Sequence, residues 1–293
     1  MGRGHPESPA RLAAIEDQLI AAGIDGQLRR YEAPLALDEQ LARVHPIEYV
    51  RAIRAAAPES GTVHLDPDTA MNPYSLSAAL RAAGAAVLAT DLVLKNEVTS
   101  AFCSVRPPGH HACRARPMGF CIFNNVAVAA RHAVHAHGLE RVAIIDFDVH
   151  HGNGTEEIFE DDPQVLMAST FQHPFYPYSG TESPASNMVN IPLAAGAGSK
   201  QFREAVTRHW LPALEKFRPE LVIFSAGFDA HVEDEMAMLR LQDADYGWVT
   251  GQIKTIAERH AQGRIVSMLE GGYALSALGR SVVQHLRVLA ELN

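Results

Sequence analysis

Two aspartates and a histidine alternate directly after an apolar run in the middle of the chain: Asp146, Asp148 and His150. In an extended backbone alternate side chains point the same way, so these three share one direction, while Phe147 and Val149 face the packed side. Two carboxylates and an imidazole on one buried face are costly unless something compensates them. Because carboxylate oxygen and imidazole nitrogen are ordinary zinc ligands, the pattern predicts a metal site rather than a metal-free polar cluster.

A catalytic zinc ion holds three protein groups and keeps one position open, so a third ligand is required. Asp229 follows another apolar run, in the segment 226–231, and is the candidate.

Two adjacent histidines, His110 and His111, follow a Pro-Pro-Gly turn. One neutral imidazole could act as general base toward an activated water, and the other could protonate a leaving amine. Each needs an acceptor on its far ring nitrogen, for which we expect Asp146 and the side-chain oxygen of Asn153. A histidine pair alone is more often a satisfied surface feature, but the neighbouring metal motif favours catalysis.

Tyr273 follows two glycines, Gly271 and Gly272, which let the backbone approach its neighbours closely. Its hydroxyl could donate a hydrogen bond to a developing oxyanion. The alternative is a tyrosine that covers the edge of the core.

Three aromatic residues, Phe120, Tyr176 and Phe228, lie in segments that follow predicted strands, and Gly119 before Phe120 suggests tight backbone geometry. Aromatic walls suit a narrow channel for an aliphatic chain, although core packing is an alternative for each residue. Other candidate polar residues are interpreted as structural: His5, Arg11, His45 and Glu48. A solvated helix face is expected for His132, His135 and His137.

Apolar periodicity predicts the elements that must hold these residues. A helical repeat predicts helices near 8–22, 39–56, 75–94, 124–137, 200–217, 243–261 and 276–291. Short β-rich runs predict buried strands at 100–106, 141–147, 164–169, 220–225 and 264–269. This alternation predicts one α/β domain over 1–293, with a mostly parallel sheet and helices on both faces. The candidate residues follow the carboxyl ends of five strands, where open α/β sheets bind ligands.

Bulk composition excludes some classes of protein. The 293 residues carry a net charge of −9, so a nucleic acid gains no bulk attraction, and no apolar stretch approaches the roughly 18 residues of a membrane helix. The three cysteines, Cys103, Cys113 and Cys121, show no CxxC spacing, which favours reduced thiols and a cytoplasmic protein.

Five motifs, in chain order, resemble the histone deacetylase family: RPPGHH, GFCIFNN, DFDVHHGNGT, SAGFDAH and LEGGY. The similarity begins at GHPESPARL (4–12), runs to 269–273, and is greatest to the class II-like bacterial branch, the histone deacetylase-like amidohydrolases. It implies an arginase-like α/β fold and zinc-dependent removal of acetyl groups from lysine side chains or similar amines.

The resemblance also implies roles for individual residues. Zinc would be held by Asp148, His150 and Asp229. The base would be His110, with His111 as its electrostatic or acid partner. Tyr273 would stabilise the oxyanion, and Phe120 with Tyr176 would flank the acyl-lysine tunnel. A structural potassium ion is implied at Asp146, Asp148, His150, Ser169 and Thr170, and a second one near Phe159, Asp162 and Val165.

Several positions depart from related patterns. Asn153 stands where class I members have aspartate, which should alter the basicity of His111. Gly152 stands where arginases, which share the fold, have an aspartate for a second metal, so we expect one catalytic metal. Family members usually have a strand before the Gly-His-Pro-Glu motif, so we expect that an edge strand and part of the pocket rim are missing. The loop 173–188 is rim-like, and its specificity cannot be read.

Two alternatives stay open. One is an acetylpolyamine amidohydrolase on the same scaffold, although the run at 226–231 resembles the deacetylase branch more. The other is an inactive module that binds acyl-lysine. The sequence leaves the preferred acyl chain, the natural substrate and the oligomeric state undecided.

Overall fold

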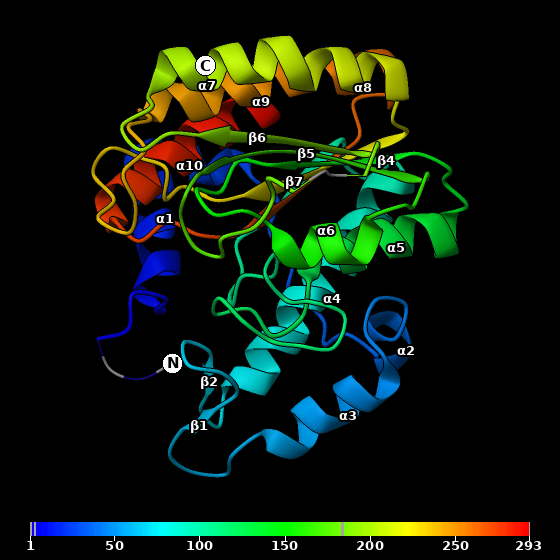
Figure 1. The fold of residues 1–293 in the computed structure, drawn as a ribbon, viewed down its shortest axis with the longest axis vertical. Coiled ribbons are helices and arrows are strands. Elements are labelled where there is room, and N and C mark those ends of the chain that lie inside the picture. Colours follow the sequence, from blue (N-terminus) through cyan, green and yellow to red (C-terminus); the bar gives the residue numbers. More distant parts are fainter. Residues whose placement is uncertain (1, 3, 183–184, 293) are drawn as a thin grey trace.

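A central sheet of six parallel strands organises the computed structural model, which describes residues 2, 4–182 and 185–292 (Figure 1). The strand order is β3-β8-β7-β4-β5-β6, with every neighbouring pair parallel. The strands are β3 Ser100–Cys103, β4 Val142–Asp146, β5 Val165–Gln172, β6 Met188–Leu193, β7 Leu221–Ala226 and β8 Ile265–Leu269. A small antiparallel pair, β1 Val63–His64 and β2 Ala70–Met71, lies apart from this sheet.

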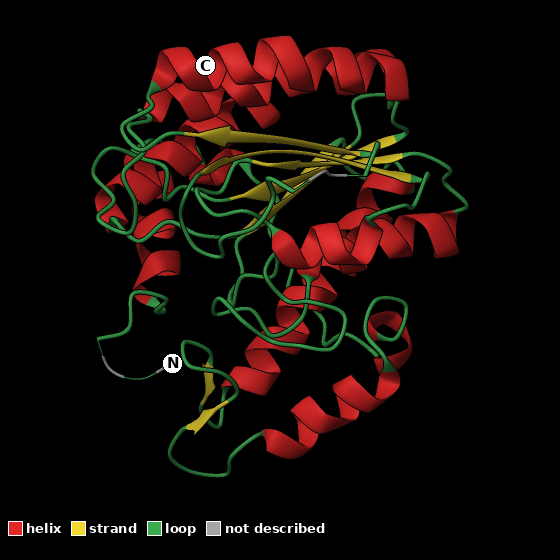
Figure 2. Ribbon diagram, in the orientation of Figure 1, coloured by secondary structure: helices red, strands yellow, loops and turns green. Residues whose placement is uncertain are grey.

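Helices cover both faces of the sheet (Figure 2). One face packs against α1 Ala10–Ala21, α7 Ser199–Ala205, α8 Leu211–Phe217, α9 Asp243–His260 and α10 Leu275–Leu289. The other packs against α2 Asp38–Leu41, α3 Ile47–Ala56, α4 Ser75–Leu94, α5 Asn125–His137 and α6 Asn153–Phe159. The short η1 Asp25–Gln27 follows α1, and the π-helical η2 Val206–Trp210 joins α7 to α8. The predicted α/β class, with a mostly parallel sheet between helical layers, is confirmed.

Strand β4 shows why its sequence is almost continuously apolar. Val142 and Ile144 pack in one core cluster, whereas Ala143, Ile145 and the following Phe147 pack in the other. Because alternate side chains of a strand face opposite sides, a strand between two helical layers needs apolar residues at every position.

Helix α4 is the central helix of one layer. Among the described residues it is the one helix long and apolar enough to cross a membrane by length and composition, but 67% of the relevant window is buried inside the protein. It is therefore explained as a core helix of this fold.

Some elements differ from the prediction. The single helix predicted over 39–56 is two helices, because Pro46 has extended backbone angles and begins α3. Strand β6 was not predicted, since this edge strand contains Asn190 and Pro192 and is only partly buried. Helix α6 was also missed.

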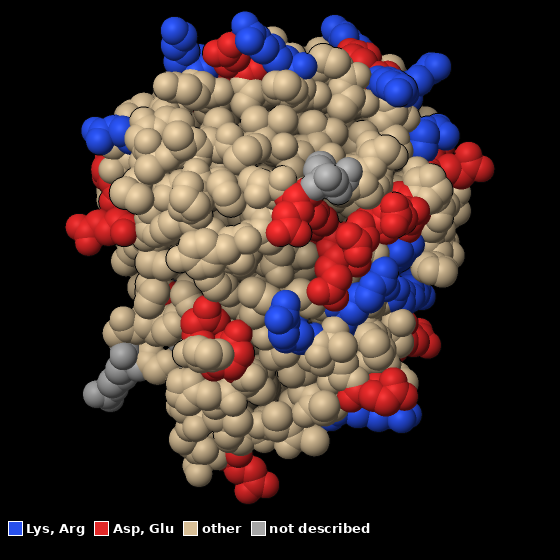
Figure 3. Space-filling view, in the orientation of Figure 1, with Lys and Arg blue, Asp and Glu red and all other residues tan. Residues whose placement is uncertain are grey.

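The first strand of the sheet in chain order, β3, lies at one edge of the sheet. A hollow of about 550 Å³ lies beside β3, between α1, α4 and α10. On the face seen in Figure 3, acidic and basic side chains lie next to one another in several groups, and most of the surface is uncharged.

Candidate active site

The predicted chemical residues meet beyond the carboxyl ends of the parallel strands, in a pocket of about 180 Å³. It is lined by Asp68, Pro108, His110, His111, Gly119, Phe120, His150, Phe175, Tyr176, Met236, Gly271 and Tyr273. The hollow beside β3 is larger, but its lining is mainly apolar and it contains no histidine. We therefore place the candidate site in the smaller pocket.

Three buried ligand-type side chains converge at this pocket: Asp148, His150 and Asp229. Their ligand atoms all lie within 4.8 Å of one another. His150 Nδ1 is 2.9 Å from Asp148 Oδ1 and 3.4 Å from Asp229 Oδ2. Asp148 and Asp229 are each 1% exposed, so their charge needs a partner inside the protein.

The backbone leaves space beside these carboxylates. A Cβ atom at Gly271 would lie 2.0 Å from Asp229 Oδ2, and one at Gly227 would lie 2.1 Å from Asp148 Oδ2. Within the residues that the structure describes, Asp229 Oδ2 is buried without a hydrogen-bond partner. A carboxylate oxygen that accepts no hydrogen bond, beside a second carboxylate and an imidazole, is part of a donor set that fits a divalent cation.

The electrostatics agree with this fit. Burial and the charge of Asp148 raise the pKa of Asp229 to about 6. Burial opposes the charged form of His110, but the carboxylates of Asp148 and Asp146 outweigh it and raise its pKa to about 10. A cation held by these carboxylates would offset the negative charge that causes both shifts.

The two adjacent histidines have different partners. His110 Nδ1 lies 3.0 Å from Asp146 Oδ2, and His111 Nδ1 lies 2.8 Å from Asn153 Oδ1. Each acceptor takes the Nδ1 proton and leaves Nε2 free to face the pocket. The two acceptors are those expected from the sequence, and the structure places the carboxylate behind His110 and the amide behind His111.

Tyr273 lines the pocket, and burial raises the pKa of its hydroxyl well above the usual value, so the group stays a proton donor. Arg11, interpreted as structural from the sequence, lies beneath it. The Arg11 guanidinium carbon is 5.0 Å from the centre of the Tyr273 ring, and its Nε donates to Gly272 O over 2.7 Å. Arg11 therefore supports the loop that carries Tyr273.

Two of the predicted aromatic walls lie in the pocket: Phe120 and Tyr176. Phe120 has a φ of 68° and Gly119 a φ of 56°, both in the left-handed region. A Cβ at Gly119 would lie 2.3 Å from the His111 ring, so the close approach requires glycine. His5, also interpreted as structural, places its ring 4.7 Å from that of Phe120.

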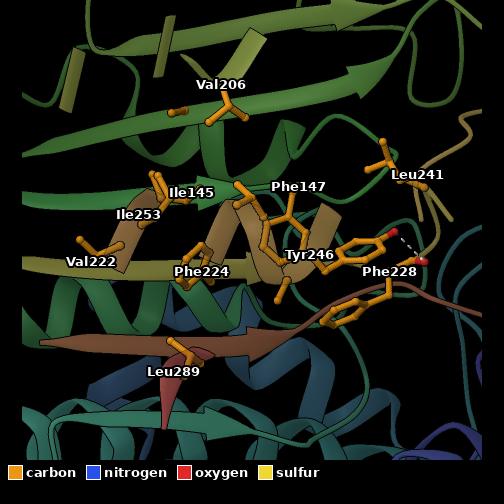
Figure 4. Packing of buried hydrophobic residues seen from close by; sticks show 14 of the residues in the cluster. Ile145, Phe147, Val206, Val222, Phe224, Phe228, Leu241, Tyr246, Ile253 and Leu289 are labelled. Carbon is orange, nitrogen blue, oxygen red and sulfur yellow. Dashed lines mark hydrogen bonds between the residues drawn. The ribbon is translucent and has the colours of Figure 1, made fainter. Parts of the chain in front are cut away.

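The proposed wall residue Phe228 is not in the pocket, and this expectation was wrong. It is 1% exposed and packs against Phe147 and Tyr246, whose hydroxyl donates to Phe228 O (Figure 4). Gly272 likewise lies behind the pocket, where its Cα faces Phe228 and Leu278. Chain position after a strand did not reveal which way these residues face.

The residues expected to hold a first potassium ion lie on the β4–β5 side of the metal group. Ser169 on β5 is in register with Asp146 on β4, and Thr170 follows it. Within the described part of the chain, Ser169 Oγ is buried without a hydrogen-bond partner. An unpaired hydroxyl beside a carboxylate is consistent with a monovalent cation there.

The three residues expected to hold a second potassium ion lie around the side chain of Asn187. The carbonyl oxygens of Phe159, Asp162 and Val165 converge as expected, but on the side-chain amide of Asn187. Asn187 Nδ2 donates to them over 2.8, 3.0 and 2.9 Å. One amide nitrogen has two hydrogens for three carbonyl oxygens, so the second potassium site stays a prediction.

The helix histidines also differ from expectation. His135 is exposed, but Nε2 of His132 and of His137 lies 2.8 and 2.7 Å from Asp91 Oδ1. Arg43 Nη1 is 2.7 Å from His132 Nδ1. Because arginine always donates, the His132 proton must sit on Nε2, which leaves no lone pair there for a metal.

Sequence reasoning missed several pocket residues: Asp68, Pro108, Phe175 and Met236. Phe175 stacks on the His150 ring with centroids 5.4 Å apart. It also missed the role of Glu270, whose Oε2 accepts from the backbone N–H groups of Gly109 and His110 over 2.6 and 3.1 Å. Glu270 lies in the LEGGY motif, but no local signal in the sequence showed that its side chain reaches another strand end.

Comparison with known proteins places this geometry in a family. The model of the histone deacetylase domain matches residues 5–289. The histone deacetylase-like amidohydrolase of Pseudomonas aeruginosa is 39% identical over 97% of this chain and 77% of its own length. The polyamine deacetylase HDAC10 of Mus musculus is 36% identical over 97% of this chain but 44% of its own length.

A solved structure, the crystal structure of the HDA15 HD domain, has a TM-score of 0.94 and 36% identity, covering 100% of this chain and 85% of that one. This likeness confirms the resemblance inferred from the five motifs and the arginase/deacetylase-like fold. The chain belongs to the histone deacetylase family.

Proposed function

We propose that this chain is a zinc-dependent amidohydrolase that removes acetyl groups from lysine side chains or similar acylated amines. The observation that carries the proposal is the convergence, in one narrow pocket, of a buried Asp-His-Asp group, two oriented histidines and a tyrosine.

The metal ion would be held by Asp148, His150 and Asp229, and it would polarise the acyl carbonyl and lower the pKa of a water molecule. Gly152 supports a single catalytic ion, because a Cβ there would lie 2.5 Å from Asp146 Oδ2 and a side chain has no room. The Ser169 hydroxyl supports potassium as an additional structural ion.

His110 is the better general base of the histidine pair. It accepts a proton from water at Nε2, and the Asp146 carboxylate behind its Nδ1 stabilises the imidazolium that results. The amide oxygen of Asn153 gives His111 no comparable charge compensation, so His111 acts as a neutral hydrogen-bonding partner. Water adds to the acyl carbon, the C–N bond breaks, and His110 returns the proton to the departing amine.

Tyr273 donates its hydroxyl hydrogen bond to the oxygen that becomes negative when water adds. The raised pKa of its phenol keeps that proton in place at neutral pH.

The pocket walls support a lysine-type substrate. Phe120, Phe175 and Tyr176 would enclose an aliphatic chain, and Met236 adds a further apolar wall. A polyamine carries more cationic nitrogens than a lysine side chain and would need carboxylates to bind them. The pocket lining offers the carboxylate of Asp68, which already accepts a hydrogen bond from Gly119 N over 3.0 Å. An acetylpolyamine amidohydrolase stays the second candidate because a relative at 36% identity is named a polyamine deacetylase.

The deciding experiment compares kcat/KM on an acetyl-lysine peptide and on acetylspermidine, with zinc-loaded wild-type protein and Tyr273→Phe. We expect the peptide to be the better substrate and the variant to lose at least about a hundredfold in kcat. Turnover by a zinc-loaded variant close to that of the wild type would contradict the assignment of Tyr273. Peptide binding without turnover by the wild type would instead identify an inactive acyl-lysine-binding module.

A further inference from the structure

A buried carboxylate outside the metal group connects two parts of the pocket. Asp234 lies in the loop between β7 and α9 and is 5% exposed. Its Oδ2 accepts from the backbone N–H groups of Tyr273 and Ala274, over 2.6 and 2.9 Å. Its Oδ1 accepts from the backbone N–H of Met236 over 3.0 Å. One side chain therefore joins the loop of the tyrosine to the loop of a pocket wall.

The contact between Asp234 and Ala274 lies at the beginning of helix α10. Ala274 is the residue that precedes the helix, and its methyl group cannot accept the free N–H groups there. Asp234 instead accepts from the N–H of Ala274 itself, just before the first helical residue, and its negative charge suits the N-terminal end of the helix dipole. The contact thus fixes the entry to α10 from a residue 39 positions away in the chain.

The loop needs such an anchor because its own backbone is permissive. Gly271 and Gly272 precede Tyr273, and Gly272 has a φ of 121°, a region that other residues avoid. Arg11 binds the carbonyl of the peptide unit between Gly272 and Tyr273, and Asp234 binds the N–H of that unit and the N–H of the next one, at Ala274. Held at both ends, the Tyr273 backbone has little freedom to move its ring.

We propose that Asp234 is a positioning residue that holds the Tyr273 hydroxyl where the oxyanion forms. The inference rests on the proposed function of Tyr273 and deepens it, because it names the group that fixes the geometry of the donor. Asp234 does not touch the substrate: it acts through the backbone of Tyr273. Preorganised donors stabilise a transition state more than flexible ones, so the loss should appear mainly in kcat.

The test is a double-mutant cycle with wild type, Asp234→Ala, Tyr273→Phe and the double variant, all loaded with zinc. A trifluoroacetyl-lysine peptide keeps slow variants measurable, because its electron-poor carbonyl is attacked more easily. We expect Asp234→Ala to lower kcat at least tenfold in the wild type and less than twofold when Tyr273→Phe is already present. Equal loss of kcat in both backgrounds, or no loss in the wild type, would overturn the proposal.

Two further variants separate positioning from folding. Asp234→Asn keeps the side-chain volume and one acceptor oxygen, so it should fold and show an intermediate loss of kcat. It replaces the alanine variant in the same cycle if that variant does not fold. Glu235→Gln removes the neighbouring, exposed carboxylate and should behave as the wild type. Failure of the proposed function is distinguishable, because Tyr273→Phe alone would then retain wild-type turnover whatever Asp234 does.

Discussion

At the residue scale, the histidines of this chain have environments that sequence alone did not separate. His285 is fully buried in the aromatic core, where its ring is 5.2 Å from that of Phe224. Its Nδ1 lies 2.6 Å from Thr250 Oγ1, which itself donates to Tyr246 O, so His285 donates at Nδ1. Its Nε2 can then accept from Ser267 Oγ at 2.9 Å. This histidine is held neutral by geometry, and burial lowers its pKa to about 3.

That arrangement predicts a pH-dependent stability. The pKa of His285 is lower in the folded than in the unfolded protein, so the unfolded state takes up an extra proton as the pH falls below about 6.5. The contribution of neutral His285 to the free energy of unfolding is complete above that pH. It is lost toward pH 3, at about 1.4 kcal/mol per pH unit. Urea unfolding measures this effect. Between pH 7.5 and 5.0, the free energy of unfolding should fall by about 2 kcal/mol more in the wild type than in His285→Gln. Exposed His135→Gln is the control, and parallel pH slopes for all three proteins would contradict the prediction.

At the element scale, helix α4 illustrates how packing reverses an intrinsic preference. Alanine normally stabilises a helix interior by about 1 kcal/mol relative to glycine. At Gly84, however, a Cβ would lie 2.0 Å from Pro34 O, in a segment tied to the helix by the Ala36 N–H donating to Leu80 O. The segment before α2 packs on α4 only because this position has no side chain.

Gly84→Ala should therefore destabilise the protein by about 1–3 kcal/mol, the cost of forcing an extra group into a packed interior. Gly251→Ala in α9 is the matched change, since its nearest atom would be Val288 Cγ1 at 3.8 Å, and it should stabilise by up to about 1 kcal/mol. Denaturant unfolding of both variants measures the sign of the change in the free energy of unfolding that each substitution causes. A stabilising Gly84→Ala would show that the 33–36 segment does not pack as described.

At the scale of the whole molecule, the metal group links three strand ends. Asp148 and His150 follow β4, Asp229 follows β7, and Gly271, which contacts both carboxylates, follows β8. Two buried carboxylates lie close together here, and burial together with the charge of Asp148 raises the pKa of Asp229. Metal binding should therefore stabilise the whole fold and not only the reaction.

Removal of metal by a chelator should lower the melting temperature, and zinc should restore it. At free zinc about a hundredfold above Kd the gain is about 2.7 kcal/mol, or roughly 5 °C or more for a chain of this size. Asp229→Ala is the control, since it should show no zinc-dependent shift. Equal melting temperatures with chelator and with zinc, for the wild type, would argue against a metal held by these residues.

Local pattern determined much of this protein before any tertiary contact was known. The apolar runs predicted five of the six strands and most helices, because periodicity reflects which faces are buried. The motif after β4 predicted the shared direction of its acidic and basic side chains, since alternation is a property of one strand. The sequence also named Asp146 and Asn153 as acceptors for the two histidines, and the link between Asn153 and His111 came from the family resemblance.

Only the tertiary structure decided the features that depend on distant segments. It placed Phe228 in the core and Phe175 and Met236 in the pocket, because the direction of a loop side chain is set by what the loop packs against. It also brought Asp234 to Tyr273 and the Asn187 amide to three carbonyls. Such contacts join residues far apart in sequence, where no periodic signal reports a hydrogen bond.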